Sequence, residues 1–258
     1  MSEFPLPNDS HDLRGQVALV TGTTSGLGWR FARVLAKAGA KVAVTGRRTE
    51  RLEELAKTIR DEGGECAPFR LDMTDMANVV DVVGQAEDAL GLVTILVNNA
   101  GIPDAQWAHK MEQDLIDRVF DTNLRGPFVL SCEVARRLIA AKQPGRMVNI
   151  SSVGGFHYAG GAAALYSITK AGIARMSEVL AVEWARNHIN VNCIAPGAFD
   201  SEMMDGMVGR IGEFYKAAPR KRLCDPAQLD STLLYLCAPA SECVTGTVIK
   251  VDDGQGPR

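Results

Sequence analysis

Tyr166 and Lys170 have the residue types and the spacing for proton-transfer chemistry, in the stretch LYSITKAG at 165–172. A free tyrosine has a pKa of about 10, so it exchanges protons poorly near neutral pH. On a helix, a lysine four residues later lies on the same face, with the two Cβ atoms about 6 Å apart. Its ammonium group would stabilise the phenolate and lower the pKa of Tyr166. The same spacing also occurs in helices that only pack, so the pair has to be judged with the rest of the chain.

A glycine-rich turn, TGTTSGLG at 21–28, follows an apolar run and leads directly into a helical pattern. Its glycines allow a tight turn whose N–H groups approach a pyrophosphate, and the helix N-terminus adds a positive dipole end. A strand before the turn and a helix after it favour dinucleotide binding. The expected cofactor contacts here are Gly22, Ser25, Gly26, Leu27 and Gly28.

The end of the second apolar run, VAVTGRRTE, bears on which dinucleotide is bound. An NAD site places an acidic residue about 20 positions beyond the glycine turn. Here Gly46 stands 18 positions after Gly28 and is followed by Arg47 and Arg48. Glycine leaves room for a 2′-phosphate, which an arginine binds bidentately. We therefore expect NADP(H) over NAD(H), with Arg47 as the ligand and Arg48 in support. The alternative is that both arginines are solvated at a helix entrance, and acceptance of both cofactors stays open.

Short apolar runs alternate with longer amphipathic stretches along the chain. The expected strands are 16–22, 41–46, 65–72, 94–101, 146–152, 189–197 and 247–254. The expected helices are 27–38, 50–62, 75–90, 112–142, 164–187 and 226–238. Continuously apolar strands are covered on both faces, and strand–helix alternation makes right-handed crossovers. The prediction is an α/β fold: a single Rossmann-type, doubly wound parallel sheet of about seven strands with helices on both faces. It forms one domain, 15–258, after a polar tail, 1–14.

Residues 199–225 interrupt this alternation with methionine, glycine and charge, just after a strand ends. Ligands of open α/β sheets bind at that edge, and adaptable methionines suit a mobile lid. We expect a lid over a pocket; the alternative is an ordinary surface excursion.

Composition excludes several classes of protein. The net charge of −3 gives no electrostatic case for binding nucleic acid or an anionic membrane. No apolar run approaches the roughly 20 residues that span a bilayer. The six cysteines form no CxxC pair and are interpreted as free thiols in a reducing cytoplasm. The four histidines lack ligand spacing with any cysteine, so no metal site is expected.

The turn at 21–28, NNAG at 98–101 and YSITK at 166–170 together resemble the single-domain branch of the short-chain dehydrogenase/reductase family. The resemblance covers nearly the whole chain. It implies that Tyr166 is the general acid/base, and that Lys170 tunes Tyr166 and binds the nicotinamide ribose. A positively charged nicotinamide ring would further stabilise the phenolate.

The resemblance also implies a serine that holds the substrate oxygen, and NISS offers Ser151 and Ser152. The family's serine is usually the second of such a pair, which favours Ser152. The loop that follows is one residue longer than usual, with Ser152 fourteen residues before Tyr166, so Ser151 stays open.

Four further residues match positions with family roles. Asn123 matches an asparagine that helps hold a proton-relay water, and Asp72 matches the residue that binds the adenine amino group. Asn99 matches the residue beside the adenosine ribose. Ser201 stands where a threonine commonly binds the nicotinamide carboxamide.

The resemblance implies hydride transfer between a nicotinamide cofactor and a carbonyl/secondary alcohol pair, by a homotetramer. The substrate stays open among relatives that reduce 3-oxoacyl thioesters or that act on sugars or steroids. Two rival functions are a dinucleotide-sensing regulator, which needs only the phosphate turn, and a cofactor-neutral isomerase or dehydratase on the same fold.

Overall fold

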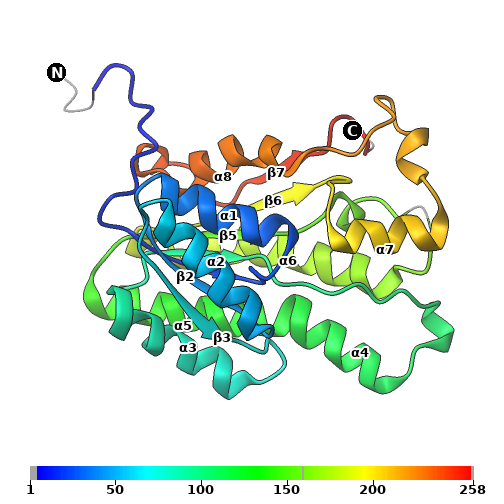
Figure 1. Cartoon of the computed structure of the whole chain (residues 1–258), viewed down its shortest axis with the longest axis horizontal. Coiled ribbons are helices and arrows are strands. Elements are labelled where there is room, and N and C mark those ends of the chain that lie inside the picture. Colours follow the sequence, from blue (N-terminus) through cyan, green and yellow to red (C-terminus); the bar gives the residue numbers. More distant parts are fainter. Residues whose placement is uncertain (1–4, 159, 257–258) are drawn as a thin grey trace.

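The computed structural model describes residues 5–158 and 160–256, built around one parallel sheet in the order β3-β2-β1-β4-β5-β6-β7 (Figure 1). The strands are β1 (Val17–Thr21), β2 (Lys41–Gly46), β3 (Cys66–Arg70), β4 (Ile95–Asn98), β5 (Gly145–Ile150), β6 (Ile189–Pro196) and β7 (Val248–Val251). This arrangement confirms the predicted Rossmann-type sheet. Residues 1–4 of the expected tail lie outside the described residues.

Helices cover both faces of the sheet, as Figure 1 shows. One layer contains α1 (Gly26–Lys37), α2 (Thr49–Asp61) and α8 (Asp230–Cys237). The other contains α3 (Met76–Leu90), α5 (Gly126–Ala141) and α6 (Ala164–Trp184). Successive β1 residues serve the two cores in turn: Leu19 packs with the α3, α5 and α6 side, and Val20 with Phe31 of α1. Burial on both faces explains why the strands are apolar throughout.

Two helical segments differ from the prediction. The expected helix 112–142 is divided into α4 (Gln113–Phe120), a π-helical turn (Asp121–Arg125) and α5. The expected lid contains a helix, α7 (Glu202–Ile211), which the sequence analysis did not predict. Its two internal glycines weaken helix propensity by about 1 kcal/mol each relative to alanine, so the local signal for a helix is poor.

The strand order reverses between β1 and β4, so the loops at their carboxyl ends diverge and leave a crevice. The glycine-rich turn follows β1, and NNAG follows β4 from its last strand residue, Asn98. The described helices include none that is long and apolar enough to cross a bilayer.

Candidate active site

A cleft of about 1210 Å³ opens at the carboxyl edge of the sheet. Its lining joins the glycine-rich turn, the ends of β2 to β6, the start of α6 and the segment around α7. The expected site residues that line it are Gly22, Ser25, Gly26, Leu27, Arg47, Asp72, Asn99, Ser152, Tyr166, Lys170 and Ser201. Gly28 and Asn123 are not part of this lining.

Gly28 closes the turn behind the cleft wall. A Cβ atom there would lie 2.3 Å from the Gly22 carbonyl oxygen, so only glycine lets the helix begin this close to the strand. Gly22 has φ +70°, and a Cβ on it would lie 2.8 Å from Ala100 Cα. The Asn99 side chain fastens the turn, since its Nδ2 donates to the carbonyl oxygens of Thr21 (2.9 Å) and Gly22 (3.1 Å).

The two asparagines of NNAG point to different places. Asn98 is buried, and its Nδ2 donates to Ser131 Oγ (3.0 Å) and Asn149 Oδ1 (2.8 Å) beneath the sheet edge. Asn99 lines the cleft. Only the second asparagine is therefore placed to meet a ligand.

The two serines after β5 also differ. The Ser151 hydroxyl is buried and donates to the Lys170 carbonyl oxygen at 2.6 Å, which ties β5 to α6. The Ser152 hydroxyl accepts from Gly154 N at 3.1 Å, and it lowers the pKa of the neighbouring Tyr166. Both serines line the cleft, but the Ser151 hydroxyl proton is already donated to the backbone, so Ser152 is the better placed of the two beside the tyrosine side chain.

The protein itself raises the pKa of Tyr166, contrary to the lowering expected from Lys170. Burial is the main cause, the hydrogen bond with Ser152 opposes it, and the Asp104 carboxylate adds to it. Burial also lowers the pKa of Lys170 to about 8. Lys170 Nζ lies 5.6 Å from the Tyr166 ring centre and donates to the Ile150 carbonyl oxygen at 2.8 Å. Burial thus favours the neutral form of both groups.

Asn123 lies in the π-helical turn and is buried. Its Oδ1 accepts from Ile102 N (2.8 Å), and its Nδ2 donates to the Ile102 carbonyl oxygen (2.9 Å) and to Thr169 Oγ1 (3.2 Å). It therefore fixes the segment after NNAG to α6, one residue from Lys170. A Cβ on Gly101 would lie 3.3 Å from Lys170 Nζ, so the backbone at the end of NNAG lies close to the lysine.

Asp104 is a site residue that the sequence analysis missed. Its buried Oδ2 accepts from Leu165 N (2.8 Å) and Tyr166 N (3.1 Å), and its Oδ1 accepts from Ala105 N (2.8 Å). It caps the first turn of α6 from a loop about 60 residues earlier in the chain. The N-cap residue of α6 itself is Ala163, whose side chain makes no capping bond. The helix lacks a cap in its own sequence, and that was the only signal available.

The end of β2 has no room for an acidic side chain at residue 46. A Cβ there would lie 2.7 Å from Thr24 Cγ2. Thr24 is β-branched, and its hydroxyl accepts from the Arg48 guanidinium at 2.8 and 3.0 Å. Arg48 also bonds Glu202 of α7 at 3.2 Å. A hydrogen bond from Ser25 and then the one from Arg48 lower the pKa of Glu202.

Arg47 has no such partner, since its guanidinium makes no hydrogen bond or ion pair with the described residues. It lines the cleft beside Asp72. Burial raises the pKa of Asp72, but bonds from Thr74 N and Oγ1 and the charge of Arg47 outweigh it, so the net shift is downward. Asp75, and not Asp72, caps α3.

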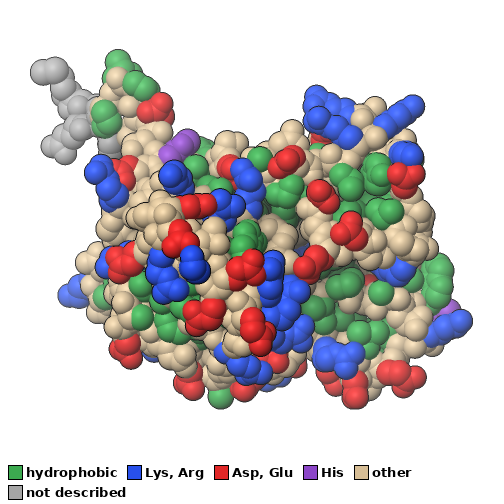
Figure 2. Space-filling model, viewed as in Figure 1, with side chains coloured by type: hydrophobic (Ala, Val, Ile, Leu, Met, Phe, Trp, Pro, Cys, Tyr) green, Lys and Arg blue, Asp and Glu red, His purple; other side chains and the backbone are tan. Residues whose placement is uncertain are grey.

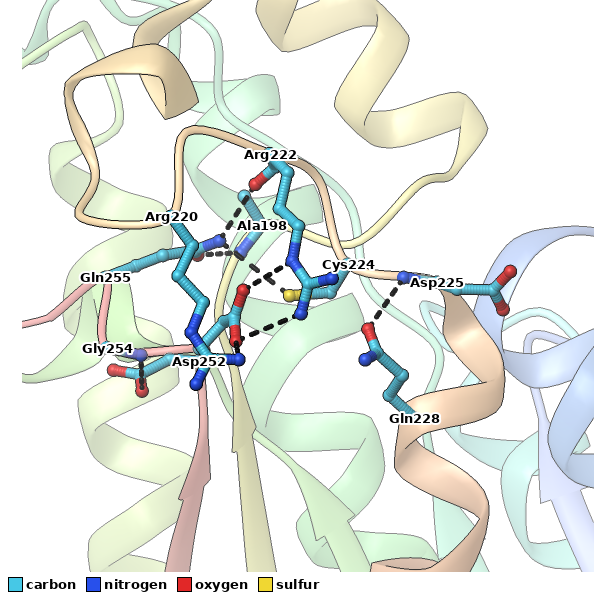
Figure 3. A network of polar contacts seen from close by, with 10 residues as sticks. Ala198, Arg220, Arg222, Cys224, Asp225, Gln228, Asp252, Gly254 and Gln255 are labelled. Atoms are coloured by element: carbon cyan, nitrogen blue, oxygen red, sulfur yellow. Dashed lines mark hydrogen bonds and ion pairs between the residues drawn. The ribbon is translucent and has the colours of Figure 1, made fainter.

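The expected lid leaves and re-enters the fold at one place. Phe199 pairs with Cys224 in an isolated bridge, and Cys224 N donates to the Ala198 carbonyl oxygen at 2.9 Å. Figure 3 shows the C-terminal segment bonded to the start of the expected lid, where Gln255 Oε1 accepts from Ala198 N at 2.6 Å. Arg222 donates to Asp253 at 2.8 Å. Ser201, which lines the cleft, also caps α7 by accepting from Met204 N at 3.3 Å.

The longer loop after Ser152 begins against α6, where Ser167 Oγ donates to the Gly154 carbonyl oxygen. Its far part has left-handed backbone at Gly160, Gly161 and Ala162. His157 and Tyr158 line the cleft, whereas Trp107 does not. No three His, Cys, Asp or Glu side chains gather as metal ligands within 5–158 and 160–256.

Known proteins share the sequence pattern of this chain. The short chain dehydrogenase pattern matches residues 16–209. The 3-oxoacyl-[acyl-carrier-protein] reductase of Thermotoga maritima is 32% identical, over 94% of this chain and 98% of that protein.

Two solved structures share the fold and contain cofactor. A gluconate 5-dehydrogenase from Burkholderia cenocepacia in complex with NADP and tartrate is 32% identical with a TM-score of 0.89, over 96% of this chain and 98% of that one. An actinorhodin polyketide ketoreductase variant with NADPH is 30% identical with a TM-score of 0.88, over 94% and 98% of the two chains.

Proposed function

The chain belongs to the short-chain dehydrogenase/reductase family and is an oxidoreductase of alcohol/carbonyl pairs; on that premise we propose that it uses Tyr166 as proton donor and acceptor, with NADP(H) preferred. One observation carries the proposal. The Ser152 and Tyr166 side chains lie together on the wall of the cleft that also contains the glycine-rich turn and Lys170. A regulator that only senses dinucleotide does not require that arrangement.

In the reducing direction, the Ser152 hydroxyl hydrogen-bonds the substrate's carbonyl oxygen and fixes its position. The Tyr166 hydroxyl gives its proton to that oxygen as the carbonyl carbon gains hydride, so an alcohol forms. In oxidation Tyr166 takes the proton back. A bound nicotinamide supplies the hydride in one direction and accepts it in the other. General acid–base groups of this kind contribute roughly 10²- to 10⁴-fold in rate.

Lys170 and Asn123 support this transfer from behind Tyr166. The Lys170 ammonium lies beside the tyrosine ring, and we assign it the nicotinamide ribose as well. Asn123 keeps the segment after NNAG and the α6 helix together, so that Lys170 stays on the cleft wall. At the other end of the cleft we assign the glycine turn to the pyrophosphate, Asn99 and Asp72 to the adenosine, and Ser201 to the carboxamide.

The preference for NADP(H) is supported by the end of β2. Thr24 fills the space that an acidic side chain at position 46 would need, and Arg48 holds Thr24 there. Arg47 lines the cleft with its guanidinium free of partners among the described residues, and the guanidinium fork matches a 2′-phosphate.

We also propose a homotetramer in the cytoplasm. Large apolar side chains stay exposed on α4 to α6, on the helices expected to pair across a two-fold axis. They are Phe120, Phe128, Ile139, Ile168, Val179 and Val182. All six cysteines are free thiols, which suits a reducing compartment.

The test of the reaction is a panel of ketones and secondary alcohols assayed with both cofactors. Each product formed should be matched by one nicotinamide oxidised or reduced, followed by its absorbance. Product formed without that change would indicate an isomerase or dehydratase. Cofactor binding without any turnover across the panel would favour a sensor.

A further inference from the structure

The substrate half of the cleft, lined by α7, the 212–219 segment and the 157–163 loop, differs in charge from the cofactor half. Among the described residues that line the whole cleft, the acidic ones are Asp72 and Glu202, and both lie with the cofactor residues. Glu202 is already paired with Arg48. The substrate half therefore contains no carboxylate among those lining residues.

One face of α7 makes part of the apolar wall there. Its residues are Met203, Met204, Met207, Arg210 and Ile211, all of which line the cleft. Positions i, i+1, i+4, i+7 and i+8 form a single helical stripe. Figure 2 shows hydrophobic side chains gathered over α7 and the segment that follows it. An arginine within such a stripe places a charge where the helix otherwise presents apolar side chains.

Three of the four other basic residues of the 199–225 segment are paired with acidic side chains, whereas the fourth, Lys221, lies outside the cleft lining. Lys216 pairs with Glu213, and Arg220 and Arg222 pair with Asp253. Arg210 makes no ion pair or hydrogen bond with any described residue, and it is the only basic residue of this segment that lines the cleft. It lies in the last turn of α7, roughly 13 Å along the helix from Ser201 at 1.5 Å per residue.

The far end of α7 approaches the loop at 160–163. A Cβ on Gly161 would be in van der Waals contact with Ile211 Cδ1, at 3.7 Å, so this glycine lies near the helix end that carries Arg210. A ligand that extends from Tyr166 through the methionines would meet the guanidinium at this rim.

We propose that Arg210 binds the carboxylate of a substrate whose middle is hydrocarbon, that is, an oxo acid or hydroxy acid with its charge remote from the reacting carbon. The proposal rests on the proposed function and names its substrate class. One guanidinium balances the single charge of a monocarboxylate. The methionines and the isoleucine of α7 provide apolar contacts for the hydrocarbon middle of such a substrate.

The test compares each linear oxo acid, from 4-oxopentanoate to 9-oxodecanoate, with its own methyl ester. The two differ in charge and hardly in shape. For one chain length or more, the wild type should favour the acid in kcat/KM, and Arg210→Gln should lower that preference about 10- to 100-fold, as for loss of a charged hydrogen bond. Arg210→Lys should restore part of it. Arg33→Gln, which removes a cation paired with Glu62 outside the cleft lining, is the matched control and should leave the preference unchanged.

Equal use of acid and ester by the wild type at every length, or an equal loss on both in Arg210→Gln, would overturn the assignment of Arg210. Turnover of esters with no advantage for acids would leave the proposed function intact. If no probe is turned over, the proposed function is judged on the panel of ketones and secondary alcohols, and the same acid–ester comparison is made on Kd with the enzyme and NADPH. In that titration, equal Kd values for acid and ester also overturn the proposal.

Discussion

Replacing Asp104 with asparagine should separate its charge from its role as a helix cap. The amide oxygen of asparagine can still accept from Leu165 N and Tyr166 N, so the first turn of α6 keeps its cap. The negative charge that raises the pKa of Tyr166 is removed. The pKa of Tyr166 should therefore fall relative to the wild type, while the tyrosine stays in place.

The expected magnitudes follow from the three bonds that the carboxylate accepts. Asparagine caps helices about as well as aspartate does. Asp104→Asn therefore loses only the bond to Ala105 N and the charge–dipole attraction, which lowers the unfolding free energy by about 1 kcal/mol. That corresponds to a fall in Tm of about 2–4 °C. Asp104→Ala removes the cap entirely and should cost about 2 kcal/mol, or roughly 4–8 °C.

The assay is kcat/KM for alcohol oxidation against pH, measured with thermal unfolding of the same proteins. Oxidation needs the Tyr166 phenolate, so its rate rises with pH through the pKa of that residue. In Asp104→Asn the rising limb should move to lower pH, and in reduction the falling limb should move the same way. An unchanged pH profile in Asp104→Asn would refute the electrostatic role. A wild-type Tm and rate in Asp104→Ala would refute the cap itself.

Four further outcomes test other parts of the site. Tyr166→Phe should lower kcat more than about 100-fold with cofactor Kd changed only a few-fold; substantial remaining activity would exclude Tyr166 as the proton donor. Burial holds the pKa of Lys170 near 8, below its ordinary 10.5. Between these two pH values the folded protein therefore binds fewer protons than the unfolded chain, so the stability that this residue contributes rises with pH. From pH 8 to 10.5, the unfolding free energy of the cofactor-free wild type should increase relative to that of Lys170→Met by about 3 kcal/mol. A difference that stays constant with pH would contradict a buried lysine with a lowered pKa. Arg47→Ala should reduce kcat/KM for NADPH about 10- to 100-fold with little change for NADH, whereas Arg70→Ala, on the neighbouring strand end outside the cleft, should not; a wild type that prefers NADH would defeat the assignment. Light scattering should report four copies and Val182→Glu smaller species, and a wild-type monomer at micromolar concentration would rule out the tetramer.

The fold could be predicted because its signals are local. Each strand is a short apolar run, and each crossover helix carries an amphipathic pattern, so the seven strands and their order along the chain follow from the sequence. The failures have local causes as well. Nothing in DTNLR announces a π-helical turn, and Gly206 and Gly209 weaken the helical pattern of α7. The order β3-β2-β1-β4 follows only from the preference for this winding, not from any residue.

Positions within the site were partly predictable, because a motif fixes which residues come together but not what each side chain contacts. The sequence did not decide whether Ser151 or Ser152 holds the substrate oxygen. The structure separates them by the bond from the Ser151 hydroxyl to the Lys170 carbonyl oxygen. It placed Arg47 and Arg48 together, yet Thr24 and Glu202 engage only Arg48. Asp104 reaches α6 across about 60 residues of chain, and no spacing rule joins a loop carboxylate to a helix that lacks its own cap.

The wrong sign for Tyr166 has a consequence for how the site works. The spacing of Tyr166 and Lys170 indicates the charge of the lysine but not the cost of burying both groups. Burial raises the pKa of the phenol and lowers that of the amine. In the protein itself Tyr166 is therefore a proton donor, the form that carbonyl reduction needs. Oxidation needs the phenolate, and a positive ring beside Tyr166 would favour it. Only the oxidised nicotinamide has that charge, and it is the form of the cofactor that alcohol oxidation consumes.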